Sequence, residues 1–129
     1  MDKDAMPSSA DALSALLSWL RERHAEIMGH EKAALAALEK NDTDGYRRFM
    51  VDKAVRIAAL GEDAAAPLAA LPDDIREAAS SALRRFSGGA QNALRLDSSF
   101  YMSALLYPDD HKKGEPDNLQ RLIAELEKN

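Results

Sequence analysis

The stretch LSALLSWLRERHAEIMGHEKAALAAL, residues 13–38, predicts the fold class. Its apolar positions recur in alternating steps of four and three residues, the spacing that aligns side chains on one face of an α-helix. This is a heptad seam, interrupted at Glu31. Leu16, Met28 and Leu35 widen the stripe, as in a bundle helix rather than a two-stranded coiled coil. The seam positions are Leu13, Leu17, Leu20, His24, Ile27, Glu31, Ala34 and Leu38.

This first helix is predicted to begin after Ser8 and to end near Glu39. Ser8 is a favourable N-cap residue, and Asp11 places an acidic group near the positive end of the helix dipole. Residues 1–8 are expected to form a disordered lead. The turn formers of residues 41–45 separate this helix from the next one.

A second helix follows this turn, and the same four-three rhythm continues from Tyr46 to Ala64. Pro67 and Pro72 interrupt the residues that follow. Because proline lacks a backbone N–H and clashes with the preceding helical turn, it bends or ends a helix. Pro72 followed by two aspartates is typical of a new helix start.

The third helix is predicted to extend from Pro72 to Tyr107, with Gly88 and Gly89 near its middle. The apolar rhythm keeps its phase across the glycine pair, so we interpret the pair as a weak point in one continuous helix. Two separate helices remain the alternative, because paired glycines weaken a helix.

These elements predict an all-α fold, a long antiparallel helical hairpin or three-helix bundle formed by residues 9–107. Residues 108–116 are expected to be a polar linker, and residues 117–129 a short C-terminal amphipathic helix. A helix of about 12 residues is marginal by itself, so this one must dock on its own bundle, on another copy or on a partner. Its apolar face consists of Leu119, Leu122, Ile123 and Leu126.

The composition argues against several functional classes. The 129 residues carry a net charge of −5 and no cysteine, so neither a nucleic-acid binder nor a thiol-based site is indicated. The acidic start Met1–Asp4 lacks the apolar run of a signal peptide, and no segment approaches the ~20 apolar residues of a membrane span. We therefore expect a cytoplasmic protein without a membrane span.

No residue pattern indicates an enzyme, a cofactor or a metal. The only histidines are His24, His30 and His111, and no serine lies in a glycine-flanked elbow. Glu26 and His30 could meet on one helix face, but the repeated Glu/His pairs of a di-iron bundle are absent. His24 lies on the seam, either as a hydrogen-bonded core histidine or as a position that determines specificity. Residues 109–111 are interpreted as a solvated turn rather than a metal site.

The most informative stretch is FYMSALLY, residues 100–107, which is apolar nearly all round. One interpretation is the deep core of the bundle. The other is a binding surface for a partner, since aromatic residues and methionine are enriched at protein interfaces. Phe100, Tyr101 and Met102 are therefore candidate partner-binding residues.

Three segments resemble the flagellar export chaperone FlgN family. Met50–Ala54 with Leu60 resembles that family's second helix, Gln91–Leu94 resembles its third, and Glu31–Leu38 with Asn41 and Asp42 resembles its opening. The resemblance covers roughly residues 12–107. It also extends to the overall plan of long antiparallel helices followed by a detachable amphipathic C-terminal helix.

This resemblance implies a chaperone that holds helical termini of hook-associated flagellar subunits before export. The family uses its C-terminal segment for client binding, which by position implies Leu119, Leu122, Ile123 and Leu126 as contacts, in a helix-in-groove mode. Two alternatives remain: a self-associating coiled-coil adaptor, such as a homodimer joined through residues 13–38, and a helical protein that binds a metal or small ligand.

Overall fold

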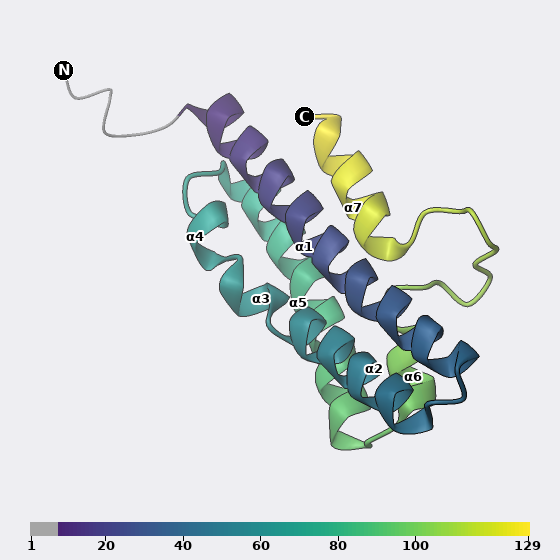
Figure 1. Ribbon diagram of the computed structural model, residues 1–129. Coiled ribbons are helices and arrows are strands. Elements are labelled where there is room, and N and C mark those ends of the chain that lie inside the picture. Colours follow the sequence, from purple (N-terminus) through teal and green to yellow (C-terminus); the bar gives the residue numbers. More distant parts are fainter. Residues whose placement is uncertain (1–7) are drawn as a thin grey trace.

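The structure is a computed structural model that describes residues 8–129, and it confirms the all-α prediction (Figure 1). The described residues contain seven α-helices and no strand. The lead predicted for residues 1–8 lies, except for Ser8, outside the described residues. The helices are α1 (Ser9–Glu39), α2 (Thr43–Ala58), α3 (Leu60–Asp63), α4 (Ala65–Leu68), α5 (Asp73–Arg95), α6 (Ser99–Ala104) and α7 (Asn118–Glu127).

Both ends of α1 lie where the capping signals predict them. The Ser8 hydroxyl accepts a hydrogen bond from the Asp11 N–H at 3.1 Å. At the other end, Asn41 adopts the left-handed conformation with φ of 60°, a common way to end a helix. The Asp42 carboxylate then accepts a hydrogen bond from the Gly45 N–H at 2.9 Å and so caps α2.

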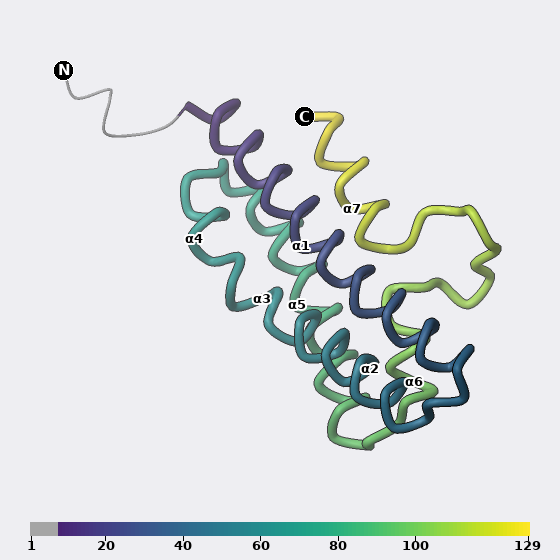
Figure 2. The backbone as a smooth tube through the Cα atoms, viewed as in Figure 1, coloured from purple at the N-terminus to yellow at the C-terminus, as the bar shows by residue number. Residues whose placement is uncertain are grey.

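The helices run alternately up and down (Figure 1), and the tube view traces the same path (Figure 2). α1 spans the molecule, and α2, α3 and α4 return along it in sequence. α5 then runs back against α2 and α3. α6 packs on α2 at one end, whereas α7 lies beside α1 with the C-terminus near the start of α1. The connection between α6 and α7 loops outward from this assembly.

The second helix is shorter than the predicted span of residues 46–64, because α2 ends at Ala58 and two short helices follow. A serine of α5 stabilises this break. The buried Ser87 hydroxyl donates to the Ile57 carbonyl at 3.0 Å and accepts from the Gly61 N–H at 2.9 Å. The backbone groups freed where α2 ends are therefore satisfied by a side chain of a neighbouring helix.

The third helix passes through Gly88 and Gly89 without a break, as interpreted from the sequence, but it ends at Arg95 rather than at Tyr107. Asp97 adopts a left-handed φ of 52° and turns the chain. Ser98 then caps α6, its hydroxyl accepting a backbone N–H of the first turn at 3.1 Å. Aspartate and serine both favour such local turns, so this end was marked in the sequence by Asp97–Ser99.

Two clusters of buried side chains form the core. The larger cluster joins α1, the end of α2, α3, α4, α5 and α7, and includes Leu16, Leu20, Ile27, Leu83 and Leu119. The smaller cluster joins the C-terminal half of α1 with α2, α5 and α6. Its buried members are Ala34, Met50, Ala54, Ala93 and Met102.

Candidate protein-binding groove

The apolar face of α7 packs against its own chain. Leu119 is 0% exposed, and Ile123 and Leu126 are also buried, all three within the larger core cluster. Only Leu122 of this predicted set remains partly exposed. The C-terminal helix therefore docks in cis in this structure, and contact of its three buried residues with a partner would require α7 to move.

A buried carboxylate holds the start of α7 on α1. Asp117 forms a reciprocal capping box with Gln120, each side chain accepting the other's backbone N–H at 2.9 Å. Its second oxygen lies 2.7 Å from His24 Nε2. Burial opposes ionisation of Asp117, but the hydrogen bonds from His24 and from the Gln120 backbone outweigh it and lower its pKa. His24 is thus a hydrogen-bonded residue of α1 that holds the first turn of α7 against that helix.

Asp117 is expected to make the fold acid-sensitive. A carboxylate with a depressed folded-state pKa stabilises the protein above its unfolded pKa of about 3.9, and this contribution is lost as the pH falls through the folded value. Between about pH 5 and about pH 2, Asp117→Asn should therefore lose less unfolding free energy than the native protein. Asparagine remains a good N-cap, so the helix start is preserved. Urea titrations across this pH range measure how the free energy of unfolding changes with pH.

The exposed Asp110 supplies the control for this experiment. The free energy of unfolding of Asp110→Asn should depend on pH in the same way as that of the native protein. Equal slopes for the native protein and for Asp117→Asn would contradict a stabilising role of the His24 contact.

A second buried polar cluster anchors the start of the connection that leads to α7. The Lys53 side chain is 0% exposed, and its Nζ donates to Glu31 Oε1 at 2.8 Å and to the Ser103 carbonyl at 3.1 Å. The Tyr107 hydroxyl donates to the other Glu31 oxygen, and Lys53 Nζ lies 5.2 Å from the Tyr107 ring centroid. Burial lowers the pKa of Lys53 despite the Glu31 contact. Burial and the bond to Glu31 raise the pKa of Tyr107.

This cluster was not predicted, although its signal was present. Glu31 and Lys53 each occupy a seam position, where the rhythm predicts an apolar side chain. Two charges of opposite sign on the inner faces of neighbouring helices are expected to pair, since an unpaired buried charge is costly. The contact between Glu31 and Lys53 could therefore be predicted from these two charged seam positions.

The aromatic segment divides between core and surface. Met102 is buried in the smaller core cluster, as one interpretation of residues 100–107 predicts. Phe100 and Tyr101 instead are 74% and 52% exposed, with ring centroids 5.7 Å apart. These two rings are the predicted partner-binding residues that a partner can reach without any rearrangement.

A groove runs along one face of α5, which α7 faces over its first half and α6 with the segment after it over its second half. Three adjoining depressions form it, with volumes of about 300, 380 and 270 Å³. The first two share Arg85, Phe86 and Asn118, and the last two share Leu122 and Glu125. We call this feature the α5 groove. Its floor on α5 consists of Ile75, Ala78, Ala82, Phe86, Gly89 and Ala93.

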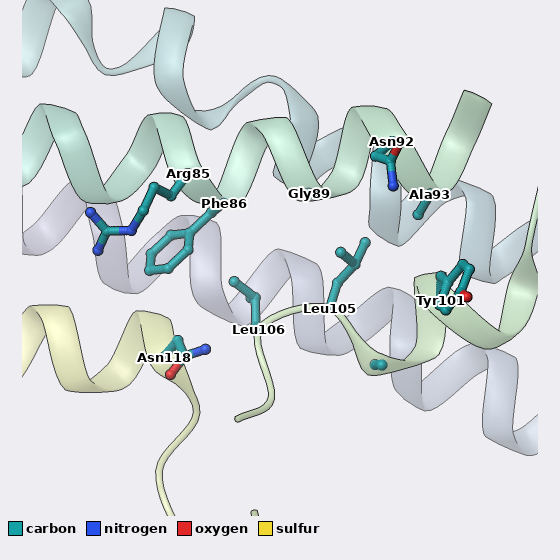
Figure 3. Close-up of a pocket in the computed structure, with 10 residues that line it drawn as sticks. Arg85, Phe86, Gly89, Asn92, Ala93, Tyr101, Leu105, Leu106 and Asn118 are labelled. Carbon is teal, nitrogen blue, oxygen red and sulfur yellow. The ribbon is translucent and has the colours of Figure 1, made fainter. Parts of the chain in front are cut away.

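Figure 3 shows the end of the α5 groove nearest α6. The Phe86 ring points from α5 into the space, and Leu105 approaches it from the opposite wall. Tyr101 lies at one end and Asn118 of α7 at the other. Leu106 closes the base in a left-handed backbone conformation with φ of 74°, and its carbonyl accepts the Asn118 N–H at 2.7 Å. A bulky residue rarely adopts this conformation, so the surrounding packing must hold it there.

No group of three or more metal-ligating side chains occurs within residues 8–129. None of the helices in that part of the chain combines the length and apolar character that crossing a lipid bilayer requires. Comparison with family models, with curated proteins and with solved structures found no match to this chain. The α5 groove and the exposed ring pair beside it form the candidate binding surface.

Proposed function

We propose that this protein binds an amphipathic helix of a partner protein in the α5 groove. The observation that carries the proposal is the floor of that groove. Its residues recur in steps of three and four along α5, so they form one continuous stripe, and mostly small side chains leave room above it. From Ile75 to Ala93 the stripe is about 27 Å long, enough for about five turns of helix. An apolar groove of this form suits the helix-in-groove mode of recognition.

The more specific form of the proposal is a chaperone that holds helical termini of hook-associated flagellar subunits in the cytoplasm before export. It rests on the resemblance of residues 12–107 to the flagellar export chaperones. Direct titration of such termini with the purified protein tests it. A terminus that binds while a scrambled peptide does not supports this form, and failure of every terminus removes it while leaving helix binding in general open.

A self-associating adaptor is the competing proposal. Leu20, Ile27 and Ala34 of the predicted seam are already buried within the chain, whereas Leu38 and its neighbour Leu35 are nearly half exposed. A contact between two chains through α1 would therefore use this exposed end. Sedimentation at micromolar concentration separates the two proposals, since a strict monomer excludes the adaptor.

Tyr101 lines the α5 groove and Phe100 lies beside it, with ring centroids 5.7 Å apart, so this exposed ring pair tests the proposed surface. Replacing both Phe100 and Tyr101 with alanine should weaken binding of a partner helix about tenfold or more, because buried aromatic residues dominate interface energies. The free energy of unfolding should change by only about 0.5 kcal/mol, since both side chains are exposed. Calorimetric titration and urea unfolding measure the two quantities.

Val55→Ala is the matched control for the ring pair. Val55 is similarly exposed, but it lies on α2 and lines none of the three depressions. Its replacement should leave partner affinity unchanged. If Val55→Ala weakened binding as much as loss of the two rings, the contact surface would lie elsewhere.

A further inference from the structure

Two arginines stand on opposite walls of the α5 groove. Arg85 belongs to α5 and Arg121 to α7, and both line the middle depression beside Ala82, Phe86 and Leu122. Figure 3 shows Arg85 extending on the α7 side of Phe86, toward the wall that carries Asn118. The centre of the groove therefore presents two guanidinium groups next to apolar surface.

Neither guanidinium pairs with a carboxylate of residues 8–129. Within that part of the chain, the one side-chain hydrogen bond of Arg85 is to the Ser81 hydroxyl at 3.4 Å, and Arg121 makes none. Glu125 lines the same depression, but it pairs with Lys128 at 3.2 Å. Arg48, Arg84 and Arg95 also have no carboxylate partner in residues 8–129, but none of them lies in the middle depression. Five other arginines do pair with carboxylates: Arg21, Arg23, Arg47, Arg56 and Arg76.

Arg85 and Arg121 thus place two positive charges, without a carboxylate partner in residues 8–129, in one depression of a chain whose net charge is −5. Guanidinium groups match carboxylates geometrically, since each can donate two parallel N–H bonds. The adjoining apolar walls partly exclude water, which strengthens such a contact relative to one on an open surface. A bound helix with a carboxylate at this position would satisfy both arginines.

We propose that the occupant of the α5 groove is an acidic amphipathic helix of a partner protein. Its apolar stripe would lie on Ala82, Phe86 and Leu122, and an aspartate or glutamate flanking that stripe would pair with Arg85 and Arg121. This inference rests on the proposed helix-binding function and names the chemistry of the partner. It concerns the groove itself and leaves α7 docked as it is in the structure.

Three fluorescent peptides of about 18 residues test this partner chemistry, a length that matches the groove. All carry leucines in steps of three and four and differ at one flanking position, which is glutamate, glutamine or lysine. Titrated against the full chain, the glutamate peptide should bind about tenfold more tightly than the glutamine peptide, and the lysine peptide should bind most weakly. Raising the salt concentration from about 50 to about 300 mM should reduce the differences in affinity among the three peptides.

Arg85→Gln and Arg121→Gln should each reduce the preference for the glutamate peptide and leave affinity for the glutamine peptide within about twofold. Arg84→Gln is the matched control, because Arg84 is the exposed neighbour of Arg85 but lines a depression on another face, with Gly61 and Gln91. Arg84→Gln should leave the preference for the glutamate peptide unchanged. Both arginines of the groove are exposed, so these variants are expected to fold.

The possible results separate the two levels of the proposal. Equal binding of all three peptides would overturn the acidic-partner inference and leave helix binding standing. No binding of any peptide at millimolar concentration would overturn helix binding in the groove and the inference with it. A dimer that the peptides dissociate would identify a second copy of this chain as the occupant, and would also overturn the inference.

Discussion

Glu31→Ala is expected to lower the free energy of unfolding by about 3–5 kcal/mol, the usual cost of removing one partner from a buried ion pair. Lys53 is fully buried, and Glu31 is the carboxylate that contacts its Nζ. Without Glu31, Lys53 would keep only the Ser103 carbonyl as an acceptor. The Tyr107 hydroxyl would lose its carboxylate acceptor in the same change and keep only the weak contact with Met28 Sδ. Urea unfolding at neutral pH measures the loss.

The pH dependence of this variant identifies the cause. Glu31 raises the pKa of Lys53 against the effect of burial, so its removal should lower that pKa further. A lysine with a depressed folded-state pKa binds fewer protons when folded than when unfolded, and stability then rises with pH up to the unfolded value of about 10.4. The stability of Glu31→Ala should therefore recover as the pH rises, beginning at lower pH than in the native protein.

Combining Glu31→Ala with Lys53→Met provides the matched control. Methionine fills much of the lysine volume without a charge, so the double variant should lose less stability than the sum of the two single variants. Strictly additive losses would show that the two side chains do not interact in solution.

Leu119→Ala is expected to cost about 2–5 kcal/mol, as other replacements of fully buried leucines do. Leu119 is 0% exposed and packs in the cluster that contains Leu16 and Leu20 of α1. The expected loss depends on α7 being docked in solution, because a helix that projected into water would tolerate alanine at this position. Urea unfolding measures the loss, and amide hydrogen exchange shows whether it is confined to α7.

Leu122→Ala is the control on the same helix. Leu122 is partly exposed and lines the α5 groove, so its replacement should cost less than about 1.5 kcal/mol. Equal and small losses at both positions would contradict docking of α7. A large loss at Leu119 would instead show that α7 is docked in solution, with Leu122 as the partly exposed residue of its apolar face.

The helices themselves were largely predictable because the signals that form them are local. Ser8 caps α1 with a group three residues away, and the apolar rhythm of residues 13–38 depends only on the helical repeat. The same apolar repeat predicts a continuous helix through Gly88 and Gly89, and α5 is continuous there. Where a local turn signal was overlooked, at Asp97 and Ser98, the predicted helix was too long.

The candidate site was only partly predictable for a related reason. The residue types of Phe100 and Tyr101 predict a contact with a partner, and both side chains are exposed. The apolar face of α7 was also selected, but the sequence pattern is the same whether that face packs in cis or on a partner. Only the contacts of α7 with α1 show that Leu119, Ile123 and Leu126 are buried within the chain.

Local sequence therefore determined where helices begin, which faces are apolar and that the chain is all-α. Tertiary structure alone decided how these faces pair. Lys53 meets Glu31 across 22 residues, Tyr107 meets Glu31 across 76, and Asp117 meets His24 across 93. Such contacts depend on the packing of separate helices, which a helical repeat does not specify. The α5 groove arises in the same way, because α7 faces the first half of α5 and α6 faces the second, and the depressions lie where these helices meet α5.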